Sequence, residues 1–170
     1  MKKNMKFALA GIAGFYITVC LTASASYADN QSVTCQKYQD GYSVFRMSDN
    51  KNIGESYFTD ADECRQAADL ANQIAQNLVC SPFVNGEGDH ATGYSAFRIS
   101  DGGDLGGGFF AIFNDCQSAI GTAKNGVVCL VFDVTDSGAT FAPYDIESGS
   151  VSGDILYPSI ESCQQAHSFR

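Results

Sequence analysis

The sequence has no tryptophan, only three prolines and two histidines, and charged residues make up just 17% of it. Together with a hydrophobic content of 45%, this composition excludes collagen, a coiled coil and a wholly disordered chain. No Cys-X-X-Cys pair occurs, and His90 and His167 lie at no ligand-like spacing from a cysteine, which argues against a bound metal. No Ser/His/Asp or Cys/His set can be assembled. The sequence therefore indicates neither catalytic residues nor a cofactor, and a non-enzymatic role is favoured.

Basic residues are scarce, and three of the ten lie in the first six positions. An apolar run over residues 7–23 follows, and small residues precede a cut after Ala28 or, nearly as well, after Ala25. This order is typical of a cleaved secretory signal peptide, predicted here over residues 1–28. A retained membrane anchor and a lipoprotein acylated at Cys20 are the alternatives. The prediction places the mature chain in the periplasm or outside a bacterial cell.

Residues 29–170 form a strongly acidic chain. They keep seven basic residues against all nineteen acidic ones, a net charge of −12. Nucleic acids and anionic membranes attract proteins with a basic surface. We therefore expect neither as a partner once the signal peptide is removed.

Six cysteines remain after residue 28, and an even number in an exported chain predicts disulfide bonds. They are Cys35, Cys64, Cys80, Cys116, Cys129 and Cys163. Six cysteines allow fifteen pairings, so their spacing alone does not choose among them.

An internal repeat organises the mature sequence. Cys35, Cys80 and Cys129 are each followed three residues later by an aromatic residue and preceded two residues earlier by Val or Leu. The other three cysteines align just as well: aromatic residues stand 22 and 19 positions before each, and an alanine stands three positions after. Such self-similarity predicts three units, at residues 29–78, 79–126 and 127–170.

Each unit reads as an α+β element. In the first unit the pattern predicts strands over residues 33–38 and 42–47, a third strand opening at Gly54, and a helix over residues 60–78. The second helix is expected to end near Lys124, before an Asn-Gly pair. The predicted fold is thus three tandem disulfide-stapled ββ(β)α repeats of about 45 residues, each too small to be stable without a staple.

The length of the first helix selects the disulfides. At about 1.5 Å per residue, Cys64 near its start and Cys80 beyond its end lie roughly 20 Å apart. A disulfide needs Cα atoms within about 7 Å. The remaining arrangement has one disulfide in each unit: Cys35–Cys64, Cys80–Cys116 and Cys129–Cys163.

Length differences between the units are confined to two stretches, residues 84–92 and 133–140, which are rich in Asn, Gly, Asp and Ser. Insertions of this kind are typical of exposed loops. We therefore expect two inserted loops that differ between the units, on a scaffold that the three units share.

The candidate binding residues are two aromatic–arginine pairs on corresponding strands: Tyr42 with Arg46, and Tyr94 with Arg98. Both residue types are frequent anchors at protein interfaces. The alternative is a structural role, in which an arginine pairs with Asp145 of another unit or lies over an aromatic ring.

Asp49 and Asp101 stand at corresponding turns and raise the question of calcium. The third unit has Ser148 there, and no glutamate closes a twelve-residue calcium loop. Asp, Asn, Ser and Gly also favour turns for conformational reasons. Turn formation is the preferred interpretation, and calcium binding stays open.

These features predict an exported, non-catalytic, disulfide-rich binding or envelope/surface module, whose partner is a protein or a glycan. The alternatives are an inhibitor of a foreign enzyme that presents the inserted loops, and a small extracellular hydrolase. Protruding loops on a body without a deep pocket would favour the inhibitor. A deep pocket with converging carboxylates would favour the hydrolase.

Overall fold

The computed structural model describes residues 32–74, 76–84, 91–106 and 108–168. Within them the chain is a mixed α+β protein with small antiparallel sheets and three helices. The predicted signal peptide lies outside the described residues, as do His90 and residues 85–89 of the first inserted loop.

The elements follow one another as three hairpins, each succeeded by a helix. Group 1 contains β1 (Val33–Tyr38), β2 (Gly41–Arg46), β3 (Lys51–Phe58) and α1 (Ala61–Ile74). Group 2 contains β4 (Leu78–Phe83), β5 (Gly93–Arg98) and α2 (Phe113–Gly121). Group 3 contains β6 (Val127–Thr135), β7 (Gly138–Asp145) and α3 (Ile160–Ser168).

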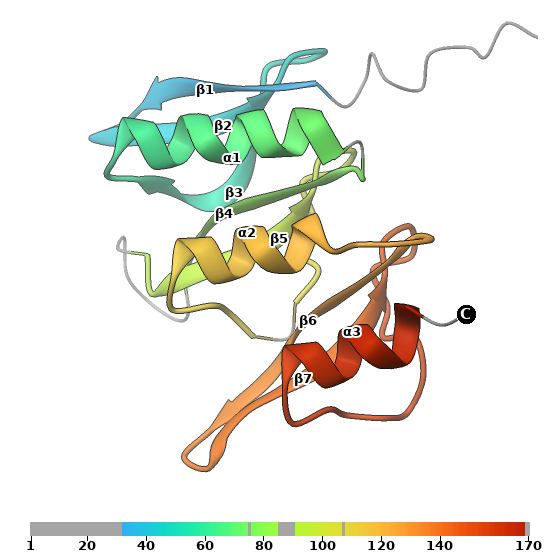
Figure 1. The fold of residues 1–170 in the computed structure, drawn as a ribbon. Coiled ribbons are helices and arrows are strands. Elements are labelled where there is room, and N and C mark those ends of the chain that lie inside the picture. The colour runs from blue at the N-terminus through green and yellow to red at the C-terminus, as the bar shows by residue number, and fades with distance from the viewer. Residues whose placement is uncertain (1–31, 75, 85–90, 107, 169–170) are drawn as a thin grey trace, which may run out of the picture.

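The three groups stack along one direction, with the helices one below the next on the same side of the strands (Figure 1). At the first junction β3 lies beside β4, and α1 contacts both β1 and β4. At the second junction α2 contacts β6. Among these helices of the described chain, none has the length and apolar character that crossing a bilayer requires.

One continuous hydrophobic core runs through the stack, because strand residues of all three groups and residues of α1 and α2 are buried in it, while Ile160 of α3 packs against it partly buried. Its largest fully buried side chains include Ile53, Phe58, Leu78, Phe97, Ile120 and Leu130. Burial of this apolar surface is the main favourable term for folding.

The three predicted disulfides are confirmed. Each joins the first strand of a hairpin to the helix that follows it, with Cα–Cα distances of 5.6 Å for Cys35–Cys64 and 6.0 Å for the other two. Each sulfur bridge therefore fixes a helix onto its own hairpin.

Both predicted helix ends are too late. The first helix ends at Ile74, and Asn77 has a left-handed φ of 58° that turns the chain, so Leu78 opens β4 instead of extending α1. The second ends at Gly121. Asn125 and its glycine neighbour, also left-handed, form a tight turn between Lys124 and Val127, whose backbones exchange two hydrogen bonds. Asn and Gly tolerate positive φ in any turn, so their presence did not mark the helix end.

The predicted third strand is regular only in group 1, as β3. In groups 2 and 3 it is reduced to isolated bridges, Phe97↔Asp104 and Tyr94↔Phe110, then Tyr144↔Val151 and Phe141↔Tyr157. Group 2 has four glycines among its described residues 102–108, and glycine weakens strands because it loses the most backbone entropy on ordering.

The second inserted stretch is not a loop. Strand pairing continues through Asp133↔Thr140, Val134↔Ala139 and Thr135↔Gly138, so residues 133–140 lengthen the β6–β7 hairpin. The β-branched residues Val134, Thr135 and Thr140 favour this extension over the loop that their Asp and Gly neighbours suggested.

Candidate functional site

The far end of the β6–β7 hairpin projects from the body of the molecule, at the lower left of Figure 1. Residues 132–138 are all exposed, whereas residues 128–131 on the same strand are buried. We call residues 132–138 the hairpin tip. Because the tip contributes nothing to the core, its length is not explained by the stability of the fold.

The hairpin tip is held in one shape by local hydrogen bonds. The Thr135 hydroxyl lies 2.7 Å from that of Ser137 and donates to the Gly138 carbonyl at 3.1 Å. Gly138 has a φ of 126°, a conformation that side-chain-bearing residues rarely adopt. The Asp133 carboxylate accepts from the Val134 amide at 2.8 Å. An ordered tip loses little conformational entropy when a partner binds.

The tip combines apolar and acidic groups. Phe132 is 36% exposed and Val134 is 53% exposed, and carboxylates of Asp133 and Asp136 stand beside them. Exposed apolar side chains on a projecting ordered element are typical of protein contacts. The chemical complement is an apolar groove with basic residues at its rim.

Arg46, a predicted binding residue, contacts the neighbouring group. Its guanidinium pairs with Asp49 in the adjacent turn and donates to the Ile99 carbonyl at 2.8 Å and to the Ser100 carbonyl. Its side chain is only 12% exposed. These hydrogen bonds link group 1 to group 2.

Arg98 repeats this arrangement one group later. It pairs with Asp101 at 2.7 Å and donates to the Glu147 carbonyl of group 3 at 2.9 Å. The predicted structural alternative, an arginine paired with Asp145, is not found among the arginines that the structure describes. The Asp145 carboxylate accepts from the Ser148 amide instead, and Arg98 reaches a backbone carbonyl.

Tyr94 also lies at a junction. Its hydroxyl donates to Glu63 of α1 at 3.0 Å, and its ring packs against Phe58 and Phe113. Burial, together with the hydrogen bond to Glu63, raises the pKa of Tyr94 to about 12, so the phenol stays protonated. Tyr42 is half-buried on β2. Partner binding by the two tyrosines and two arginines stays a prediction.

The carboxylates of Asp49 and Asp101, in the two corresponding turns, each pair with an arginine. The hydrogen bond from Arg46 lowers the pKa of Asp49 to about 2, so its carboxylate is ionised and paired. Asp101 accepts from the Gly103 amide as well as from Arg98. Elsewhere too, the described residues contain no group of three His, Cys, Asp or Glu side chains arranged to hold a metal ion.

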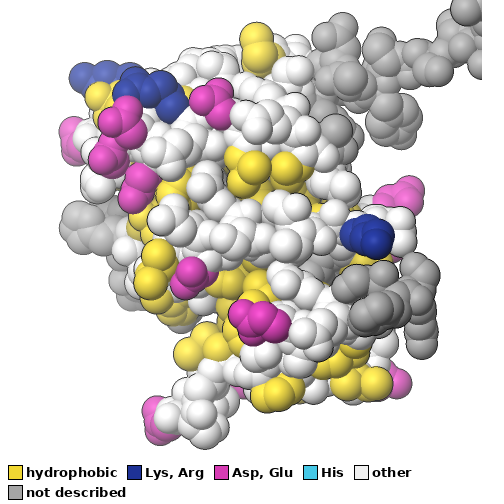
Figure 2. Space-filling view, in the orientation of Figure 1, with side chains coloured by type: hydrophobic (Ala, Val, Ile, Leu, Met, Phe, Trp, Pro, Cys, Tyr) yellow, Lys and Arg dark blue, Asp and Glu magenta, His cyan; other side chains and the backbone are white. Residues whose placement is uncertain are grey.

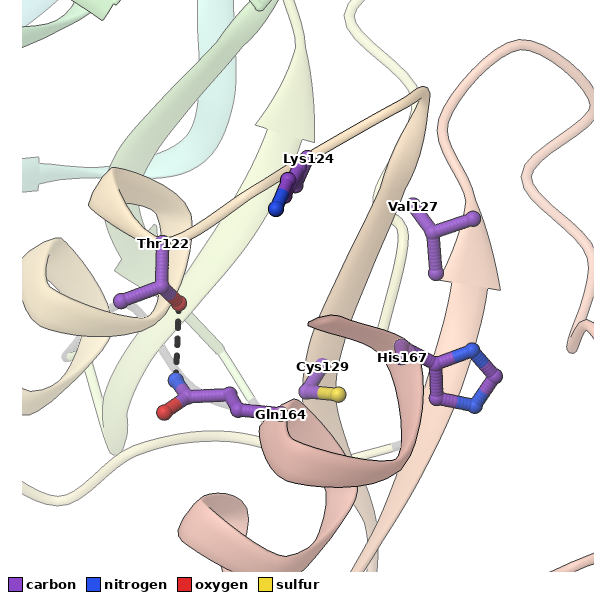
Figure 3. Close-up of a pocket in the computed structure, with 6 residues that line it drawn as sticks. All are labelled: Thr122, Lys124, Val127, Cys129, Gln164 and His167. Atoms are coloured by element: carbon purple, nitrogen blue, oxygen red, sulfur yellow. Dashed lines mark hydrogen bonds between the residues drawn. The ribbon is translucent and has the colours of Figure 1, made fainter. Parts of the chain in front are cut away.

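Two small cavities open on the described surface. One, of about 220 Å³, lies at the first junction and is lined by Ser56, Tyr57, Phe58, Thr59, Pro82, Ala91 and Tyr94. The other, of about 180 Å³, lies between the end of α2 and α3, where Gln164 donates to Thr122 at 2.7 Å and Lys124 and His167 lie nearby (Figure 3). Neither lining contains a carboxylate, so neither resembles the predicted hydrolase site.

His167 is half-buried on α3, and its ring meets Tyr157 edge-on with centroids 6.1 Å apart. The ring therefore packs against another residue of group 3. His167 and Lys124 line the same cavity, an arrangement that depends on how group 3 packs on group 2 and that no sequence pattern predicts.

No family model, curated protein or solved structure matches this chain. Its function is therefore inferred from its own residues. The sequence located the insertion at residues 133–140 but suggested a loop there, whereas the structure shows an extension of the β6–β7 hairpin.

Proposed function

We propose that the mature chain is an exported, non-catalytic binding protein that recognises a partner protein through the β6–β7 hairpin tip. One observation carries the proposal: seven consecutive residues are ordered, exposed and outside the core. An ordered, exposed projection outside the core is available for contact with another molecule, and binding residues are frequent on such elements.

We further propose that the three groups are copies of one unit, with bounds at residues 29–78, 79–126 and 127–170. The corresponding bridges, the three hairpin-to-helix disulfides and the matched contacts of Arg46 and Arg98 support this. In repeat proteins the shared positions specify the scaffold, so the sequence that differs between copies is free to carry specificity. All of the hairpin tip except Phe132 lies in one of the two stretches that differ, residues 133–140.

Export through a signal peptide at residues 1–28 completes the proposal. Three disulfides form and persist in an oxidising compartment, such as the periplasm or the cell exterior. N-terminal sequencing of the protein from its native host is expected to begin at Asp29 or Ser26. An intact Met1 in the envelope fraction would contradict export with cleavage.

An inhibitor of a foreign enzyme is a second candidate, because a projecting ordered hairpin has the form that enters a cleft. An inhibitor would use the same hairpin tip, so the two proposals differ only in the partner: an enzyme for the inhibitor, another kind of protein for the binding module. An anchor role for Tyr94 and Arg98 is a competing proposal, and their contacts within the chain reduce what they can offer a partner.

The test is to shorten the third hairpin. Replacing residues 133–139 with Asn-Gly gives it the two-residue turn that joins β1 to β2. Wild-type and shortened chains are used to capture proteins from the native extracellular fraction. The shortened chain is expected to keep its melting temperature and to lose the partner that the wild type captures.

A point variant, a control variant and a variant of the competing site complete the test. Val134→Ser is expected to weaken binding about tenfold, as loss of a buried apolar anchor does. Ile112→Ser removes a 57% exposed side chain at the start of α2 and is expected to bind normally. Equal capture by the shortened chain, with loss on combined Tyr94→Ala and Arg98→Ala substitution, would move the site to the strand face.

A further inference from the structure

The segment that follows each hairpin runs antiparallel beside the hairpin's second strand. The corresponding bridges are Tyr42↔Phe58, Tyr94↔Phe110 and Phe141↔Tyr157. Ser56, Gly108 and Ile155 each stand two residues before the bridging aromatic residue. They therefore occupy the same place in the three groups, and their surroundings can be compared directly.

In groups 1 and 2 this segment is covered by the next group. Ser56 is 6% exposed, and Phe58 and Phe110 are buried. In group 3 no group of the described chain covers the segment, and Ile155 is 65% exposed and Leu156 is 47% exposed. We call residues 151–157 the end face; they run along the lower end of the molecule in Figure 1, where Figure 2 shows hydrophobic side chains at the surface.

At both internal junctions the covering element is the first strand of the next hairpin. At the first, the Ser81 hydroxyl of β4 donates to the Ile53 carbonyl at 3.0 Å, and a Cβ on Gly54 would lie 2.2 Å from that hydroxyl. At the second, a Cβ on Gly108 would lie 2.6 Å from the Val131 side chain of β6. The two internal junctions therefore receive an extended strand at close range, whereas at the end face Ile155 stands in place of Gly108 and offers an exposed side chain on which a strand can pack.

The charge at the end face differs from that at the internal junctions. Arg46, Arg98 and Asp145 hold the same register position, each paired with the first residue of its hairpin. The two arginines donate to carbonyls of the next group. Asp145 places a carboxylate there, and Asp154 adds another beside the exposed Ile155. An occupant of the end face must therefore supply the cation itself.

A second copy of this chain does not meet that requirement. Stacked head to tail, it would set Asp145 against the turn at Met47 and Ser48, which corresponds to the carbonyls that Arg46 reaches, and a carboxylate cannot donate to a carbonyl. Two end faces placed together would bring Asp145 and Asp154 toward identical carboxylates. A net charge of −12 on residues 29–170 adds long-range repulsion between copies.

We propose that the end face docks an extended strand of another protein, one that carries apolar side chains toward Ile155 and Leu156 and arginine or lysine beside Asp145 and Asp154. This deepens the proposed binding function but uses a surface separate from the hairpin tip. The partner strand lies over the end face as β4 and β6 lie over the internal junctions, but it packs on the Ile155 and Leu156 side chains.

The experiment uses residues 29–170 in oxidised form and two synthetic peptides, measured by fluorescence anisotropy at physiological ionic strength. One peptide alternates arginine with valine, and the other replaces each arginine with glutamine. The arginine peptide is expected to bind and the glutamine peptide to bind at least about tenfold more weakly, because the acidic rim selects the cation. Combined Ile155→Ser and Leu156→Ser substitution is expected to weaken the arginine peptide about tenfold or more.

Control variants separate docking from general charge attraction. Asp145→Asn is expected to weaken binding of the arginine peptide, whereas Ile112→Ser, at the residue before α2, leaves binding unchanged. Equal binding by wild type and the double serine variant, or no binding of the arginine peptide, overturns the proposal. So does sedimentation showing a wild-type dimer that the double variant dissociates.

The chain with the shortened hairpin distinguishes the two proposals. If it binds the arginine peptide normally but no longer captures the native partner, both surfaces act independently, as proposed. If it keeps the native partner and only the double serine variant loses the peptide, the hairpin proposal fails and the end face stands.

Discussion

Arg46→Ala is expected to weaken the first junction. The substitution removes a guanidinium that donates to the Ile99 and Ser100 carbonyls of group 2 while it pairs with Asp49 of its own turn. Arg98 makes the same kind of contact at the second junction, but to the Glu147 carbonyl alone. The two arginines therefore differ in the number of bonds that cross between groups.

The expected magnitude follows from that difference. Hydrogen bonds to charged groups contribute about 1.5–3 kcal/mol, and less where water can replace the donor, so we expect Arg46→Ala to cost about 2 kcal/mol. Arg98→Ala, which breaks one such bond, is expected to cost about 1 kcal/mol. A loss of about 2 kcal/mol lowers the melting temperature of a chain of this size by roughly 4–8 °C.

Arg65 supplies a matched control. It pairs with Asp62 three residues earlier, just as Arg46 and Arg98 pair with aspartates three residues later. Both side chains are exposed, and within the described part of the chain the guanidinium makes no hydrogen bond to another group. Arg65→Ala is expected to leave stability unchanged, because exposed ion pairs contribute little.

Urea titration followed by circular dichroism measures all three variants in oxidised protein, with the free energy of unfolding taken from each midpoint and slope. The expected order of destabilisation is Arg46→Ala, then Arg98→Ala, then Arg65→Ala. If Arg46→Ala unfolds at the same urea concentration as Arg65→Ala, the arginines do not hold the groups together, and their anchor role gains support.

Three further outcomes are expected. Burial raises the pKa of Asp104, so the stability that its protonated carboxyl contributes is full below the pKa of the unfolded chain and is lost as the pH rises through the folded pKa. Asp104→Asn should therefore stabilise the protein at pH 7 but not in acid, which thermal melts at a series of pH values will test. Tyr94→Phe loses the bond to Glu63 and about 1 kcal/mol at neutral pH, and because the pKa of Tyr94 is raised to about 12, wild type alone should lose this stabilisation between pH 10 and 12. Replacing Cys80 and Cys116 with serine removes a disulfide whose cysteines are 36 residues apart, and it should lower the free energy of unfolding, measured by urea titration, by about 3–4 kcal/mol. A loss below about 1 kcal/mol would contradict the stapling role.

The sequence was sufficient for the covalent framework. One helix long enough to hold Cys64 and Cys80 apart excluded that pairing, and the alignment of the cysteines extended the conclusion to the other helices. The conclusion tolerated an error of four residues in the helix end, since α1 stops at Ile74 and still separates the two cysteines. Pairing depends on coarse distances, which survive small errors in boundaries.

The local boundaries were less predictable because the same residue types serve several turns. Asn77 and Asn125 both adopt left-handed backbone conformations, but the first redirects the chain into β4 and the second forms a turn before β6. In residues 133–140, Asp and Gly suggested a loop, while Val134 and Thr135 carried the strand pairing that prevailed. Local propensities of similar size compete there, and the cross-strand partner decides.

The sequence by itself determined the acidic charge, the cysteine pairs and the succession of hairpin and helix, because these follow from composition and from short-range periodicity. Only the tertiary structure decided what each group faces. Arg46 and Arg98 reach carbonyls of the next group, whereas Ile155 and Leu156 are exposed, with no group of the described chain covering them. Corresponding positions of the three groups share local structure but not neighbours, since burial depends on the element packed against them.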